Sequence, residues 1–214
     1  MSLRSVEKEH ARAYRWSLRL LSCLGEMAAG ETNAALLALG NAESIANGTR
    51  FPDQGLLFAN ERWRAFYHCH ADEAAHPDEH GHFHIFTDVG DRQWAHVAAL
   101  AIDGYGQPLH WFTVNRWVTG GAWFETARFR ALASEAFDDD KEALAGRWLY
   151  AMLMLYQADL LDLLNRRDAR IRECCGSAGS ESTFDRRDIH LLSKCDVDLE
   201  TKLGMHVCVQ SRCS

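Results

Sequence analysis

Six of the eleven histidines of this chain lie in one short stretch, between Tyr67 and Phe86. Five of them are spaced two residues apart, as one pair and one set of three: His68, His70, His80, His82 and His84. In a β-strand, residues two apart point to the same face of the sheet. Neutral imidazole is a common ligand for zinc, iron, copper and nickel, so two such strands side by side could bind a metal ion.

The two histidine groups are separated by polar and small residues that include Pro77, as in the connection of a β-hairpin. Antiparallel pairing about this connection would place His68 opposite His82 and His70 opposite His80, with opposed Cβ atoms about 5 Å apart. The same register puts mostly apolar residues on the reverse face: Ala65, Tyr67 and Cys69 beside Ile85, Phe83 and Gly81. One face is therefore predicted to carry imidazoles and the other to face the core.

Three alternating histidines span roughly 13 Å along a strand, so one ion would take two ligands from one strand and one or two from its neighbour. The preferred ligand set for a divalent ion such as zinc or iron is His68, His70, His80 and His82. His84 lies at the edge of this set, as a ligand, a proton shuttle or a substrate contact. The nearby acids Asp72, Glu73, Asp78 and Glu79 could complete the site or orient an imidazole. Of these residues, His84 and Glu79 are the candidate catalytic pair. His96 and His110 are secondary candidates.

A second group of candidate residues lies at positions 113–121, after a predicted strand and before a helix. Free N–H groups at a helix start favour anions, glycines permit close approach, and Arg116 could bind a carboxylate or phosphate through two hydrogen bonds. Asn115 and Thr119 could assist, which makes these three residues the candidate substrate-binding set. The alternative is that Arg116 stacks on a nearby tryptophan and that the glycines only form a turn.

These residues must be positioned by a sheet. Strands are predicted at residues 63–70, 80–87, 94–102 and 108–115, and residues 189–192 could add a fifth. The connections are short, which indicates an antiparallel meander. The fold class is therefore α+β, with a four- to five-stranded meander sheet, an N-terminal helix, and C-terminal helices packed on one face.

Two long helices are predicted around this sheet. Residues 5–29 carry an apolar stripe through Tyr14, Leu18, Leu21 and Met27, while residues 141–166 are apolar around most of the helix and should be largely buried. Shorter helices are expected within three further segments, and a surface loop within a fourth. The short helical segments are 32–39, 122–137 and 198–203, and the loop is 41–60.

Composition limits the class of protein. A chain of 214 residues, with 47% hydrophobic and 25% charged residues, predicts one soluble globular domain over residues 1–214. The formal charge of −7 argues against nucleic-acid binding. The N-terminus lacks an apolar signal segment, and the most apolar run, 148–164, is interrupted by polar residues. We therefore expect a cytoplasmic protein that binds no membrane, keeps its seven cysteines reduced and takes a small-molecule ligand.

Two resemblances bear on function. Residues 80–86, His-Gly-His-Phe-His-Ile-Phe, are similar to the histidine-triad motif of nucleotide hydrolases and transferases, which implies nucleophilic attack by His82. Gly81 departs from that motif, which usually has an apolar residue there. Three longer motifs resemble a bacterial family of unknown function, which implies no established activity. They are Tyr-His-Cys-His at 67–70, Glu-His-Gly-His-Phe-His-Ile-Phe at 79–86 and Phe-Thr-Val-Asn-Arg-Trp-Val-Thr-Gly-Gly at 112–121.

The function predicted from these patterns is a metal-dependent enzyme, either a hydrolase or an oxygenase, that acts on a small polar or anionic molecule. A non-catalytic metal- or ligand-binding protein is the first alternative, because a closed ligand set would leave no position for a substrate. Phosphoryl or nucleotidyl transfer at His82 without a metal is the second. A strand face whose histidines only form hydrogen bonds would need no ligand at all.

Overall fold

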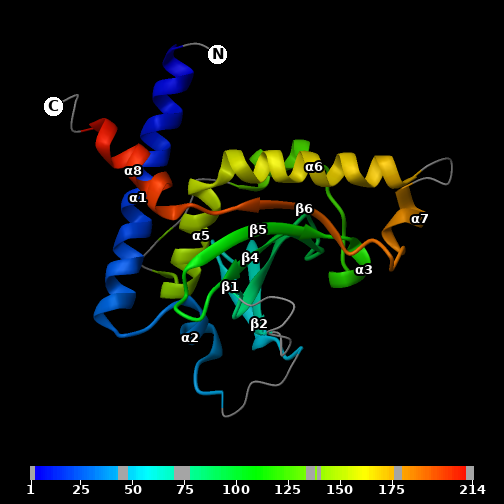
Figure 1. The fold of residues 1–214 in the computed structure, drawn as a ribbon, viewed down its shortest axis with the longest axis horizontal. Helices are drawn as coiled ribbons and strands as arrows, with labels where there is room; N and C mark the ends of the chain where they lie inside the picture. The colour runs from blue at the N-terminus through cyan, green and yellow to red at the C-terminus, as the bar shows by residue number, and fades with distance from the viewer. Residues whose placement is uncertain are drawn as a thin grey trace.

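The computed structural model of the chain describes residues 3–42, 48–69, 78–133, 138, 141–175 and 180–210. An N-terminal helical part precedes five consecutive strands, and a second helical part precedes the last strand and helix (Figure 1). The architecture is α+β, as the sequence predicts. Among the described helices, none has both the length and the apolar character needed to cross a membrane.

Six strands form one antiparallel sheet in which every strand pairs with its neighbours in sequence, from β1 to β6. The predicted meander is confirmed, and it has one strand more than the largest number expected. The strands are β1 (Phe51–Phe58), β2 (Trp63–Cys69), β3 (Gly81–Asp88), β4 (Trp94–Ile102), β5 (Pro108–Val114) and β6 (Leu191–Asp196).

The additional strand is β1, which occupies the second half of the loop predicted over residues 41–60, so that part of the prediction is wrong. Pro52 and Gly55 argue against a strand in the sequence, because proline cannot donate a hydrogen bond to a neighbouring strand and glycine weakens a strand interior. Both lie where the pairing with β2 is irregular, between Phe51 and Leu56. β1 is an edge strand, where such an interruption is tolerated.

The helices differ from the prediction mainly in where they break. The helix expected over residues 141–166 is two helices, separated at Tyr156, whose φ of −93° and ψ of 17° leave the helical region. The segment 122–137 contains only two single turns, and residues 134–137 lie outside the described residues. The helices are α1 (Leu3–Ala29), α2 (Ala34–Leu39), α3 (Arg116–Thr119), the 3₁₀ turn η1 (Thr126–Arg128), α4 (Phe129–Leu132), α5 (Leu144–Leu155), α6 (Gln157–Cys175), α7 (Ser180–Phe184) and α8 (Leu199–Gln210).

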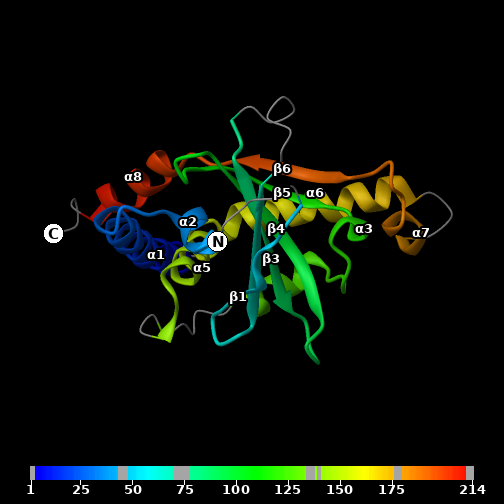
Figure 2. The same cartoon turned by 90° about the horizontal axis from the view of Figure 1, so that it is seen from below.

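The long helices cover one face of the sheet. Helix α6 lies along β6, with α1 and α8 at one end of the molecule and α3 and α7 at the other (Figures 1 and 2). Tyr67, Phe83 and Ile85 on the strands share a continuous core with Trp148 of α5 and Leu160 of α6. Each such side chain contributes about 1.5–3 kcal/mol through burial, so this face supplies most of the stability.

The buried stripe of α1 differs from the predicted one. Trp16, Leu20 and Cys23 are buried against the core, whereas Leu18 and Leu21 are exposed to solvent. The prediction selected apolar residues at helical spacing, but α1 has two such rows, and only packing against α5 decides which one is buried. Met27 belongs to the buried row, as expected.

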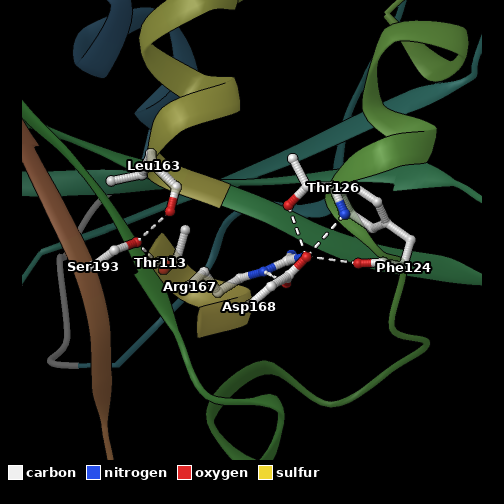
Figure 3. A network of polar contacts seen from close by, with 7 residues as sticks. All are labelled: Thr113, Phe124, Thr126, Leu163, Arg167, Asp168 and Ser193. Atoms are coloured by element: carbon white, nitrogen blue, oxygen red, sulfur yellow. Dashed lines mark hydrogen bonds and ion pairs between the residues drawn. The ribbon is translucent and has the colours of Figure 1, made fainter. Parts of the chain in front are cut away.

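A polar network ties α6 to η1 and to the segment just before it (Figure 3). The Arg167 guanidinium is 1% exposed and donates hydrogen bonds to Asp168 Oδ1 and to the carbonyl of Phe124, at 2.6–2.8 Å. The second carboxylate oxygen of Asp168 accepts from the backbone N–H and the hydroxyl of Thr126, at 3.0 and 2.7 Å. These four residues are called the Arg167 network below. They neutralise a buried charge in place, as a buried arginine requires.

Candidate metal centre

Three histidines meet on the face of the sheet opposite the main core. His68 of β2 pairs directly with His82 of β3, as the hairpin register predicts, and His84 follows His82 on the same face. One ring nitrogen from each of the three lies within 4.8 Å of those of the other two. His82 and His84 are buried, and His68 is half-buried. This set, called the ligand group below, could hold a metal ion.

The ligand group is the centre of a longer series of hydrogen bonds. Glu79 Oε1 lies 2.6 Å from His82 Nδ1, His82 Nε2 lies 3.1 Å from His84 Nε2, and His84 Nδ1 lies 3.0 Å from His96 Nε2. These four residues are called the histidine chain below. An ionised carboxylate can only accept, so the proton sits on Nδ1 of His82, and Nε2 of His82 presents a lone pair to the centre of the ligand group.

The tautomers of His84 and His96 then follow one of two patterns. If His96 donates to His84 Nδ1, then His84 Nε2 carries a proton and donates to His82, and every contact is satisfied by protein alone. If His84 donates to His96, the Nε2 lone pairs of His82 and His84 face each other at 3.1 Å, and a cation between them is needed. The geometry therefore fits a metal ligand pair and also fits a metal-free hydrogen-bonded series.

His96 reaches this face because of a β-bulge. Pairing between β3 and β4 shifts between Ile85–Ala98 and Phe86–His96, so Val97 is the extra residue of β4. In a regular strand, His96 would share the face of Ala98, which packs in the main core. The extra residue turns the His96 side chain to the imidazole face instead.

Burial favours the neutral form of two of these imidazoles, His84 and His96. Burial lowers the pKa of His84 well below its ordinary value, and the nearby His96, His82, His68 and Arg50 lower it further. Burial also lowers the pKa of His96 to about 3, with a contribution from the positive charge of Arg167. A neutral imidazole is the form that binds a metal ion, so burial favours the binding form of His84.

A cavity of about 270 Å³ opens beside the ligand group, towards β5 and β6. Glu79 and His110 lie at its polar side, where Glu79 Oε2 is 3.6 Å from His110 Nε2. Burial, followed by the charge of Lys194, lowers the pKa of His110. The remaining wall is mainly apolar. The lining residues are His68, Glu79, His82, His84, His110, Phe112, Val114, Val118, His190, Leu191 and Lys194.

His80 does not join the ligand group, which is the main departure from the predicted ligand set. It precedes β3, is exposed, and its Nδ1 lies 2.5 Å from the hydroxyl of Tyr67, whose ring belongs to the core face. Strand alternation therefore does not apply to His80. His70 lies outside the described residues. His84, predicted at the edge of the set, lies at its centre, between His82 and His96.

The structure places the three predicted substrate-binding residues in different surroundings. The Arg116 guanidinium carbon lies 4.5 Å from the centre of the Phe184 ring, with a nitrogen 4.0 Å from Asp185. Among the described residues, Arg116 is not part of the lining of the cavity beside the ligand group. Asn115 is fully buried, caps α3, and donates to the carbonyls of Thr183 and Arg186. Of the three, Thr119 alone lines cavities that reach the sheet face.

Sequence reasoning did not single out two arginines on this face. Arg64 and His68 lie on β2 at positions that alternate with the core residues Ala65 and Tyr67, so the period-two pattern that located the histidines also locates Arg64. Arg50 precedes β1, and no pattern in the sequence marks it.

A family described as a domain of unknown function, DUF6969, matches residues 15–197, and the chain belongs to this family. The resemblance to a family of unknown function pointed to such a match. No curated protein and no solved structure matches the chain. Function is therefore argued from the site itself.

Proposed function

We propose that this protein is a metal-dependent enzyme that binds one divalent transition-metal ion at the ligand group and acts on a small molecule in the adjoining cavity. The observation that carries the proposal is the convergence of His68, His82 and His84 beside a cavity. Three protein ligands and an open position are the arrangement of catalytic sites, whereas structural sites take four protein ligands.

The donor set suits zinc or iron, because neutral imidazole nitrogens bind both. When bound, such an ion would supply Lewis-acid chemistry to a polar group of the substrate. Glu79 holds the proton on His82 Nδ1 and so keeps Nε2 available as a ligand atom. His96 likewise keeps Nε2 of His84 available as a ligand atom when it accepts a hydrogen bond from His84 Nδ1.

The cavity walls provide an apolar surface and a group that can accept a proton. Phe112, Val114 and Val118 form an apolar side that excludes bulk water from the ligand group. His110 lies opposite, beside Glu79, and its lowered pKa makes the neutral ring available to accept a proton from a molecule in the cavity. A general base and a metal ligand group that share Glu79 and line one cavity support hydrolysis more directly than a purely structural role.

One rival is supported by a specific observation. The distances of the histidine chain are also those of a metal-free series of hydrogen bonds, which would serve a non-catalytic protein. The metal-dependent enzyme and the metal-free protein differ in metal content. The enzyme differs from a non-catalytic metal-binding protein in whether the ion keeps a position for a further ligand.

Metal content is measured by elemental analysis of protein purified without a histidine tag. We expect about one metal ion per chain in the wild type and its loss in His68→Ala/His82→Ala. The matched control is His80→Ala, which removes a histidine of the same stretch outside the ligand group and should keep the metal. Equal, sub-stoichiometric metal in the wild type and the double variant would remove the proposal.

The open position is tested by cobalt substitution. We expect the visible spectrum of the Co²⁺ protein to shift on addition of azide, because a fourth position is free for a small ligand. A spectrum unchanged by azide in a protein that binds cobalt stoichiometrically would favour the non-catalytic metal-binding protein. Turnover of a phosphate ester by metal-free protein, abolished in His82→Ala, would favour the histidine-triad alternative.

A further inference from the structure

A second cavity, of about 490 Å³, lies on the same face of the sheet as the ligand group, towards β1 and β2. Its walls combine two arginines, three aromatic rings and the glycine-containing turn after α3. The lining residues are Arg50, Arg64, Phe66, Phe86, Gln93, Trp94, Thr119, Gly120, Gly121 and Ala122. It is called the arginine cleft below.

The two arginines are held by aromatic rings rather than by acids. The guanidinium carbon of Arg64 lies 5.0 Å from the centre of the Phe66 ring and 4.6 Å from that of Trp94, and that of Arg50 lies 5.7 Å from the Phe66 ring. Within the described part of the chain, neither arginine forms an ion pair with an acidic residue, and the buried Nε of Arg64 has no hydrogen-bond partner. Burial and then the charge of Arg50 lower the pKa of Arg64.

Two uncompensated guanidinium groups beside one ring are unusual in a chain with a formal charge of −7. Stacking on Trp94 and Phe66 fixes the plane of the Arg64 guanidinium while leaving its N–H edge free, which suits a carboxylate held by two parallel hydrogen bonds. The rings of Phe66, Phe86 and Trp94 supply an apolar surface for the rest of such a molecule.

The arginine cleft connects with the ligand group. A small cavity of about 60 Å³ between them is lined by Arg50 and Thr119 from the cleft and by His68 and His84 from the ligand group. The buried hydroxyl of Thr119 has no hydrogen-bond partner among the described residues, so it can bond a polar atom at this junction. Arg64 pairs with Phe86, so His84 is its diagonal neighbour, about 7–8 Å away.

We propose that the arginine cleft binds the carboxylate of a small organic acid with a flat apolar body, between Arg64 and Arg50, and so sets the substrate class of the metal centre. This rests on the proposed function. The body of the acid lies against Phe66 and Trp94, and its far end reaches His84 past Thr119. The anion site moves from Arg116, where the sequence predicted it, to the other side of the same glycine-containing segment.

The test is an NMR titration of metal-free protein with sodium benzoate, followed by the indole N–H signal of Trp94, which is assigned with Trp94→Phe. We expect saturable binding that Arg64→Met weakens tenfold or more, because a charged hydrogen-bonding partner is lost. Arg50→Met should weaken it several-fold, and Arg50 is exposed, so this variant keeps the fold if Arg64→Met does not. Arg116→Met is the matched control and should bind benzoate as the wild type does.

Several outcomes overturn the assignment. Benzoate affinity within twofold of wild type in both Arg64→Met and Arg50→Met would do so, as would equal loss in Arg116→Met. Binding of inorganic phosphate but not benzoate would overturn the carboxylate class. Because the titration uses metal-free protein, its result does not depend on the metal centre, and metal content measured on the same variants separates the two proposals.

Discussion

The Arg167 network and the histidine chain are both buried polar clusters, yet they are built on opposite principles. Both oxygens of Asp168 accept hydrogen bonds, and the charge of Arg167 is balanced by the adjacent carboxylate (Figure 3). In the histidine chain, the ring nitrogens of His82 and His84 face one another beside a cavity. A cluster that satisfies its charges internally serves the fold, whereas one whose ring nitrogens meet beside a cavity has room for a ligand.

The largest effect is expected from removing Arg167, which tests whether the Arg167 network stabilises the fold. Arg167→Met should lower the free energy of unfolding by about 3–5 kcal/mol, because Asp168, whose side chain is only 13% exposed, is left with its charge uncompensated. Urea unfolding measures this loss. Arg170→Met, on the same helix but in an exposed ion pair with Glu173, should cost less than about 1 kcal/mol. Equal losses in the two variants would mean that the Arg167 network does not hold the fold.

A change in the histidine chain should lower metal affinity and leave the stability of the metal-free protein nearly unchanged. Glu79→Gln keeps an acceptor for His82 but removes its charge, so we expect metal affinity to fall about 10- to 100-fold with little change in the unfolding of metal-free protein. Competition with a chromophoric chelator measures the affinity. Glu61→Gln, in an exposed pair with Arg92, is the control and should leave affinity unchanged. Loss of stability without loss of affinity would make Glu79 a structural residue.

The effect that develops most gradually is a pH dependence carried by His96 in metal-free protein. Burial holds the pKa of His96 at about 3, so this ring stays neutral in the fold while the unfolded chain takes up a proton below about pH 6.5. Above that pH, the titration of His96 does not change the free energy of unfolding. Below it, the free energy of unfolding should fall by about 1.4 kcal/mol per pH unit, down to about pH 3. Urea unfolding at pH 7.5, 6 and 5 measures the slope, which His96→Leu should reduce; an unchanged slope would contradict the assignment.

The hairpin could be predicted from sequence because two signals agree there. Period-two histidines mark one face of β2 and β3, and period-two apolar residues such as Tyr67 and Phe83 mark the other, so only one register satisfies both. The pairing of His68 with His82 follows directly. The same argument fails for His80, because it lies before the strand begins and takes its position from the hydroxyl of Tyr67.

Other features depend on contacts that local sequence does not encode. His96 reaches the histidine chain only through the bulge at Val97, and nothing in the apolar sequence of β4 marks an extra residue. The break at Tyr156 carries no glycine or proline signal, and its position is set by packing. Arg116 has the residue type of an anion site, but its stacking on Phe184 brings together segments far apart in the chain.

The three members of the ligand group come from a single hairpin, β2 and β3. Hairpins close in about 1–10 µs, well before distant segments of a chain of this size find one another. A metal ion could therefore be captured by a chain in which α5 and α6 have not yet docked, and its binding free energy would then favour the native register over slipped ones. Metal binding would then precede the packing of the main hydrophobic core during folding.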